Sequence, residues 1–201
     1  MDRLILKIRQ MKIFKYSFGL LLGAVILLSS CRDFVEPRIP YTTFDTAAYL
    51  RTISRTSTSF SLADLASSKF EIVVEAVDIE DGGTVETVEV RVRHRRLITN
   101  VGLIYTPATD VIVKTLQKSD FAPNTTSRFL RSTILVTATE TLAAVGLAPG
   151  AIRAGDVFEF RLVLNDRFGR VFTNSNASGD LTAPFYSSPF FYPVTVVAPA
   201  P

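Results

Sequence analysis

The 201-residue chain contains no tryptophan, one cysteine, Cys31, and one histidine, His94. A single cysteine excludes a disulfide bond within the chain, and with one histidine it excludes a metal site built from these two residue types. A Ser–His–Asp triad would have to use His94, and no serine lies in a nucleophile-elbow pattern. The chain also has no glycine-rich phosphate loop, nucleotide-binding fingerprint or internal repeat. We therefore expect a protein that is not an enzyme and that holds no cofactor.

The longest apolar run is short and lies near the N-terminus. Residues 18–28 carry no charge and follow Lys12 and Lys15. A run of about 11 residues suits the core of a signal peptide and falls short of the ~20 residues that span a bilayer. Met11 precedes the same basic segment, so either Met1 or Met11 fits as the start of the signal.

The end of this run reads Leu28-Ser29-Ser30-Cys31, which resembles the lipobox of bacterial lipoproteins. The resemblance implies that Cys31 is diacylated and becomes the first residue of the mature protein, so that residues 1–31 are a lipoprotein signal peptide. Several acyl chains hold a protein stably on a membrane, whereas a single acyl chain gives only marginal membrane binding. The alternative is an ordinary free or buried cysteine behind an apolar segment.

The basic character of the chain comes from this leader. Residues 1–31 hold five of the 22 basic and one of the 19 acidic side chains, which leaves 17 basic and 18 acidic and a net charge of −1. A nucleic-acid-binding domain needs a basic footprint that survives in the folded part. We therefore expect no nucleic-acid partner.

Residues 32–46 contain Pro37 and Pro40 and show no hydrophobic period. They are predicted to be an extended tether. Residues 47–199 are long enough for one domain with a substantial core.

Period-two alternation dominates this domain and predicts half-buried strands. It is clearest over residues 69–78, 85–95 and 158–164, and the first two runs should pair directly or face each other across a core. Further strands are expected at 48–53, 111–116, 129–137, 170–173 and 191–197. The residues predicted to face the core are Phe70, Ile72, Val74, Ala76, Val88, Val90 and Val92, with Glu71, Glu75, Glu89, Arg91 and Arg93 facing out. His94 shares the valine face, which favours a structural histidine.

One helix interrupts the strands. Thr137 and Glu140 form a capping box, residues 140–145 carry an apolar stripe, and Gly146 supplies the stop. Gly169 is predicted to take a left-handed conformation in the turn that begins at Asp166. These signals predict an all-β, antiparallel fold with one short helix.

Two segments resemble bacterial immunoglobulin-like domains. Phe70–Val92, with the turn 78–83 at its centre, looks like strands B and C of that fold, and residues 154–169 look like its F–G hairpin. The resemblance implies an immunoglobulin-like β-sandwich. The chain departs from the pattern in exceeding ~100 residues, in lacking the core tryptophan and in its extra helix.

The lipobox, the tether and residues 158–170 and 188–197 are together similar to small Bacteroidota outer-membrane lipoproteins of Sus-like carbohydrate-uptake systems. The resemblance implies a non-enzymatic accessory or binding subunit, lipid-anchored in the outer membrane. Its implied partners are a TonB-dependent porin, the porin's lipoprotein lid and a glycan. Whether the domain faces the periplasm or the cell surface stays open. A free-standing structural or adhesive cell-envelope lipoprotein is the alternative.

Two groups of side chains are candidates for binding. One is an aromatic patch, which would contact a glycan or a protein partner unless its rings fill the core. The other is a row of arginines on one strand face, which would meet phosphates, sulfated glycans or an acidic partner, or else would protect an edge strand. The aromatic patch is Phe185, Tyr186, Phe190, Phe191 and Tyr192, and the basic patch is Arg91, Arg93 and Arg95.

The turn between the first two clear strands holds three carboxylates, Asp78, Glu80 and Asp81. Turn aspartates normally accept hydrogen bonds from nearby backbone amides. A calcium site or a catalytic acid pair is the alternative at this turn, although the spacing lacks a regular Asp-x-Asp-x-Asp pattern.

Overall fold

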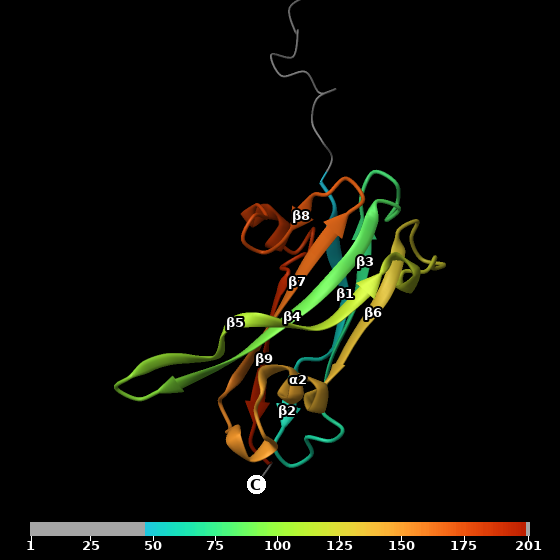
Figure 1. Ribbon diagram of the computed structural model, residues 1–201. Helices are drawn as coiled ribbons and strands as arrows, with labels where there is room; N and C mark the ends of the chain where they lie inside the picture. The colour runs from blue at the N-terminus through green and yellow to red at the C-terminus, as the bar shows by residue number, and fades with distance from the viewer. Residues whose placement is uncertain (1–46, 200–201) are drawn as a thin grey trace, which may run out of the picture. The chain divides into compact units, whose positions relative to one another are not determined.

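The computed structural model describes residues 47–199, whose strands form two β-sheets (Figure 1). The first sheet has the order β1 (Tyr49–Ser57), β3 (Lys69–Val77) and β6 (Leu130–Thr137). The second has the order β2 (Ser59–Ser61), β9 (Phe191–Val197), β7 (Val157–Asp166), β4 (Val85–Ile98) and β5 (Gly102–Gln117), and β8 (Val171–Phe172) pairs with β7. All pairs are antiparallel except β2 with β9. The predicted all-β, antiparallel fold is confirmed.

The core lies between the two sheets. The alternating residues that the sequence assigned to the interior of β3 and β4 are all fully buried. β3 and β4 belong to different sheets, so they face each other across the core and do not pair. The rings of Phe70 from β3 and Phe160 from β7 stack there, which joins the sheets directly.

Glu75 departs from its predicted exposure. Alternation places its side chain on the face away from the core, yet this carboxylate is fully buried. Arg51 from β1 and Arg131 from β6 pair with it, and the Ser127 hydroxyl donates a hydrogen bond of 2.7 Å to Oε1. Neighbouring strands and the segment before β6 therefore cover a face that the pattern alone assigns to solvent.

The predicted helix is present as α2 (Ala138–Val145). The Thr137 hydroxyl accepts a hydrogen bond from the Glu140 amide, the Glu140 carboxylate accepts one from the Thr137 amide, and Gly146 ends the helix with a φ of 71°. Gly169 likewise has a positive φ of 75°, as predicted. Three short 3-10 turns complete the described elements: η2 (Lys118–Asp120), η3 (Pro149–Ala151) and η4 (Gly179–Thr182).

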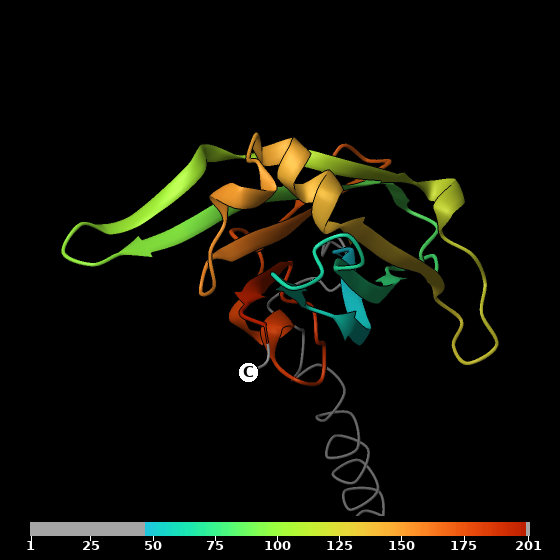
Figure 2. The same ribbon diagram turned by 90° about the horizontal axis from the view of Figure 1, so that it is seen from below.

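A two-stranded arm projects from the second sheet. The pairing of β4 with β7 ends at Arg95, whereas its pairing with β5 continues to Ile98 and Gly102. Residues 96–104 thus form a hairpin end that extends beyond the rest of the sheet, as Figure 2 shows in green. We call these residues the arm. β5 is far longer than the predicted strand 111–116. The prediction missed residues 102–110 because they do not follow the alternating pattern.

The predicted signal peptide 1–31, its Cys31 and the tether 32–46 lie outside the described residues. Among residues 47–199, no helix has both the length and the apolar character needed to cross a membrane.

Candidate functional site

The predicted basic patch lies on the outer face of the second sheet. Arg91, Arg93 and Arg95 project from this face, as alternation predicts, but each has an acidic neighbour. Arg91 pairs with Glu89 at 2.6 Å, and Arg93 and Arg95 pair with Glu159 of β7 at 2.9 and 3.4 Å. The patch is therefore a mixed network of charges. β4 lies between β5 and β7, so the alternative that these arginines protect an edge strand is wrong.

Two further residues connect this network across three strands. Arg161 of β7 donates to Asp110 of β5 at 2.9 Å and to Glu159 at 2.7 Å. Burial by itself would raise the pKa of Glu159, but the hydrogen bonds from Arg161 and Arg93 outweigh burial and lower it. The Glu159 carboxylate is thus held ionised, which suits an acceptor of hydrogen bonds and not a general acid.

A polar pocket of about 290 Å³ opens beside this network. Donors and acceptors both reach it, because guanidinium groups, a carboxylate, an amide and two hydroxyls contribute to its wall. Its polar lining consists of Arg91, Asp110, Arg161, Thr173, Asn174 and Ser175. The Arg161 guanidinium is 4.8 Å from the Phe191 ring, and that of Arg93, which belongs to the charge network but not to the pocket wall, is 4.0 Å from the Tyr105 ring. We call this site the polar pocket.

The predicted aromatic patch is divided by the structure. Phe190 and Tyr192 are fully buried, so their assignment to an exposed patch is wrong. Alternate residues of β9 face the core, and the Tyr192 hydroxyl shares a hydrogen bond of 2.8 Å with that of Thr52. Phe185 is 83% exposed, while Tyr186 and Phe191 are half-buried.

The acidic turn 78–83 serves its own backbone. The Asp78 carboxylate accepts hydrogen bonds from the amides of Glu80, Gly82 and Thr84 and from the Thr84 hydroxyl, at 2.5–2.9 Å. Glu80 pairs instead with Arg167, and Asp81 with Arg128. The three carboxylates do not converge, and the described part of the chain holds no group of three acidic, histidine or cysteine side chains that suits a metal. The geometry of this turn therefore gives no support to the calcium candidate.

His94 is a buried structural residue, as predicted. Its Nε2 lies 3.0 Å from Asp156 Oδ2, and both side chains are buried. Asp156 also receives two hydrogen bonds from Arg96 and one from the Arg153 amide. Burial would raise the pKa of Asp156, but these donors lower it from 3.8 to about 2. The cluster connects the base of the arm to the segment before β7.

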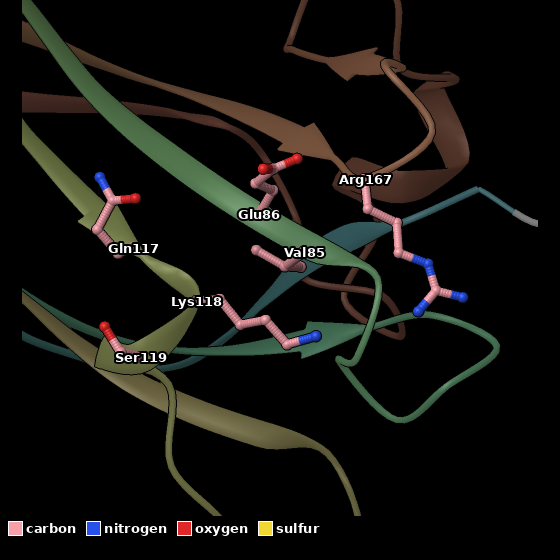
Figure 3. A pocket seen from close by; sticks show the side chains of 6 residues that line it. All are labelled: Val85, Glu86, Gln117, Lys118, Ser119 and Arg167. Atoms are coloured by element: carbon pink, nitrogen blue, oxygen red, sulfur yellow. The ribbon is translucent and has the colours of Figure 1, made fainter.

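Two other cavities offer less to a ligand. The one in Figure 3 has a volume of about 360 Å³, with Val85 and Glu86 of β4, the η2 region and Arg167 around it. Its two cations are already used, because Lys118 donates to the Gly83 carbonyl at 2.6 Å and Arg167 pairs with Glu80. A third cavity of about 420 Å³, between α2 and residues 65–66, has an almost entirely apolar lining.

Sequence reasoning found Arg91 of the polar pocket but not the residues around it. Asp110 lies before the predicted strand 111–116, and residues 173–175 begin at the last residue of the predicted strand 170–173, so no local pattern brings them together. No protein-family model matches the chain, and no curated protein matches its sequence.

Proposed function

We propose that this chain is a non-enzymatic, lipid-anchored subunit that binds a glycan for an outer-membrane nutrient-uptake complex. The observation that carries the proposal is the polar pocket. Its lining brings donors and acceptors together over a small area, and the Phe191 ring lies against Arg161 of its wall. Such a surface complements a ligand whose polar groups are mostly hydroxyls, because each hydroxyl both donates and accepts a hydrogen bond.

The charges of the network favour a neutral ligand over a phosphate or sulfate. Arg91, Arg93 and Arg161 each have a carboxylate partner within 3.0 Å. An anionic ligand would have to compete with those partners, whereas a sugar hydroxyl adds hydrogen bonds to groups already held in place. Bidentate contacts from guanidinium and carboxylate groups to neighbouring hydroxyls would fix the orientation of the ring.

The same arrangement supports binding over catalysis. Glycoside hydrolysis needs one protonated and one ionised carboxyl on either side of the bond that breaks. Glu159, beside the pocket, has a lowered pKa, and Asp110 accepts a hydrogen bond from Arg161. Asp110, which lines the pocket, is suited to accept hydrogen bonds from a ligand, while the buried Glu159 holds the neighbouring arginines in place.

An immunoglobulin-like β-sandwich is the fold that we propose for this subunit. The orders β1-β3-β6 and β2-β9-β7-β4-β5 correspond to strands A-B-E and A′-G-F-C-C′ of that fold, with β8 in the F–G connection. The parallel pairing of β2 with β9 supports the assignment of β2 as A′. The lipobox at Cys31 supports the anchor.

Ligand binding is tested by calorimetric titration of the detergent-solubilised full chain with neutral oligosaccharides. Asp110→Asn removes the charge that Arg161 contacts, and we expect at least about a tenfold loss of affinity, since hydrogen bonds to charged groups contribute about 1.5–3 kcal/mol. Glu80→Gln is the matched control, because it breaks an ion pair with Arg167 outside the pocket. Absence of binding by the unaltered protein, or equal loss in both variants, would contradict the proposed ligand.

Assembly is tested separately by affinity purification from solubilised outer membranes. Stoichiometric recovery of a TonB-dependent porin and its lipoprotein lid would support the accessory role. Recovery of the protein by itself would contradict that role and would favour a free-standing envelope lipoprotein.

A further inference from the structure

The arm has more exposed aliphatic surface than any other short segment of the described chain. Five of its nine residues, 96–104, are exposed aliphatics: Leu97, Ile98, Val101, Leu103 and Ile104. Leu97 and Val101 are 72% and 71% exposed, whereas most exposed aliphatic side chains outside the arm have a clearly lower exposed fraction. Exposed clusters of this kind mark interaction sites in soluble domains.

These side chains cover both faces of the ribbon. Leu97 pairs with Leu103 in the register of β4 and β5, so both lie on the outer face with Arg95. Ile98 and Ile104 lie on the opposite face. A flat partner would cover one face and leave the other in water, whereas a medium that surrounds the tip would cover both.

The charges behind the tip indicate the nature of that medium. From Arg93 to Thr109 the sequence holds three arginines, Arg93, Arg95 and Arg96, and no acidic residue. Glu159 of β7 and Asp156, just before β7, balance part of this charge, and Arg95, with its closest carboxylate at 3.4 Å, is the most weakly paired. Two arms meeting tip to tip would bring like charges together, which disfavours a second copy as the occupant. Anionic headgroups would be attracted to Arg95, whose own carboxylate partner is the most distant of the three.

We infer that the arm inserts its tip into the interfacial region of an anionic lipid bilayer. Aliphatic residues occupy the tip, and Tyr105 pairs with Arg95 directly behind them, so an aromatic ring and a cation lie where hydrocarbon gives way to the interface and headgroups. The insertion is shallow. The outer edge of β5 has no strand partner in the described sheet, and unpaired backbone groups are costly in hydrocarbon but not where water reaches them.

The proposed anchor permits this contact. The tip lies at the far end of β4 from Val85, and β4 spans at most about 46 Å. A tether of residues 32–46 has a maximum reach of about 50 Å, so an acylated Cys31 and the arm can meet the same bilayer. The inference does not depend on the polar pocket.

The absence of tryptophan provides a direct test. L97W places a single fluorophore on the tip, and I79W places one at a position of equal exposure, 70%, in the β3–β4 connection. Both full-length proteins are reconstituted into vesicles of phosphatidylcholine and phosphatidylglycerol, with and without acyl chains brominated as quenchers. We expect blue-shifted, quenched emission from L97W and unquenched emission from I79W.

Three outcomes would overturn the inference. Quenching of neither protein would place the tip in water. Quenching of both would show that the domain lies on the bilayer without preference for the arm. A blue shift of L97W that brominated lipid does not quench would place the tip against protein, in a second copy or another partner.

A second variant checks the energetics. Leu97→Ser with Leu103→Ser removes two exposed leucines, so the fold should persist by circular dichroism. We expect the quenching rate of a Val101→Trp probe by brominated lipid to fall at least about tenfold in this background. Ile112→Ser, on β5 outside the arm, should leave it unchanged, and an equal fall in both would also count against insertion of the arm.

Discussion

Phe70 and Phe160 stack across the interior with ring centroids 4.3 Å apart and ring planes 19° from parallel. Phe70 comes from the first sheet and Phe160 from the second. Phe60 and Tyr192 pack against this pair, with centroids 6.5 Å from Phe160 and 5.7 Å from Phe70. In a chain without tryptophan, this cluster of rings is the main aromatic contact between the sheets.

Phe160→Ala should lower the free energy of unfolding by about 3–5 kcal/mol, because it removes a fully buried ring and leaves a cavity. Urea denaturation followed by circular dichroism measures the change. Phe185→Ala is the control, since that ring is 83% exposed, and it should change stability by less than about 0.5 kcal/mol. A similar loss in both variants would mean that the interior is not packed as described.

Arg131→Met should destabilise the protein by about 1.5–3 kcal/mol, because Glu75 then remains buried with only part of its hydrogen bonding. Arg128→Met breaks an ion pair between exposed side chains, Arg128 and Asp81, and should cost less than about 1 kcal/mol. Equal midpoints in urea for the two variants would contradict the role given to Glu75.

Acid should weaken the protein through Asp156. The pKa of this carboxyl is about 2 in the folded protein and 3.8 ordinarily, so the folded state binds its proton less readily than the unfolded state. The stabilisation is fully present above pH 4 and is lost as the pH falls from about 4 to about 2. Urea midpoints measured across this range should fall less in Asp156→Asn than in the unaltered protein. Parallel pH profiles would show that the cluster with His94 and Arg96 contributes nothing to acid sensitivity.

Gly146→Ala should destabilise the protein by about 1–2 kcal/mol, because the residue has a φ of 71° and an L-residue is strained there. A Cβ at this position meets no atom within 4 Å, so the cost comes from the backbone and not from a clash. Gly150 is equally open and has no positive φ, and Gly150→Ala should be neutral or slightly stabilising. Thermal unfolding distinguishes the two.

Local patterns predicted much of this fold. The buried face of β3 and that of β4 follow from alternation, the caps of α2 follow from Thr137, Glu140 and Gly146, and β9 has the predicted bounds. Each of these depends on residues close together in sequence. Alternation does not show whether β3 and β4 pair within one sheet or face each other from different sheets. That arrangement depends on the order of all the strands, so the prediction left both possibilities open.

The features that the sequence did not predict come from tertiary contacts or from broken periodicity. Glu75 alternates as a surface residue and is buried because Arg51 and Arg131 converge on it from neighbouring strands. Phe190 and Tyr192 belong to an aromatic group that the sequence offers either as an exposed patch or as core, and both are core residues. The arm escaped detection because aliphatics on both of its faces remove the alternation that identifies a strand.

The position of β9 has a consequence for how the protein is made. This last strand lies inside the second sheet, between β7 and β2, and β2 comes from near the start of the domain. The sheet therefore cannot close until the C-terminal strand is available, however much of the chain has already emerged from the ribosome. β2 has no other strand partner in the described sheet, so the contact between the two ends of the domain forms only after residues 191–197 have been synthesised.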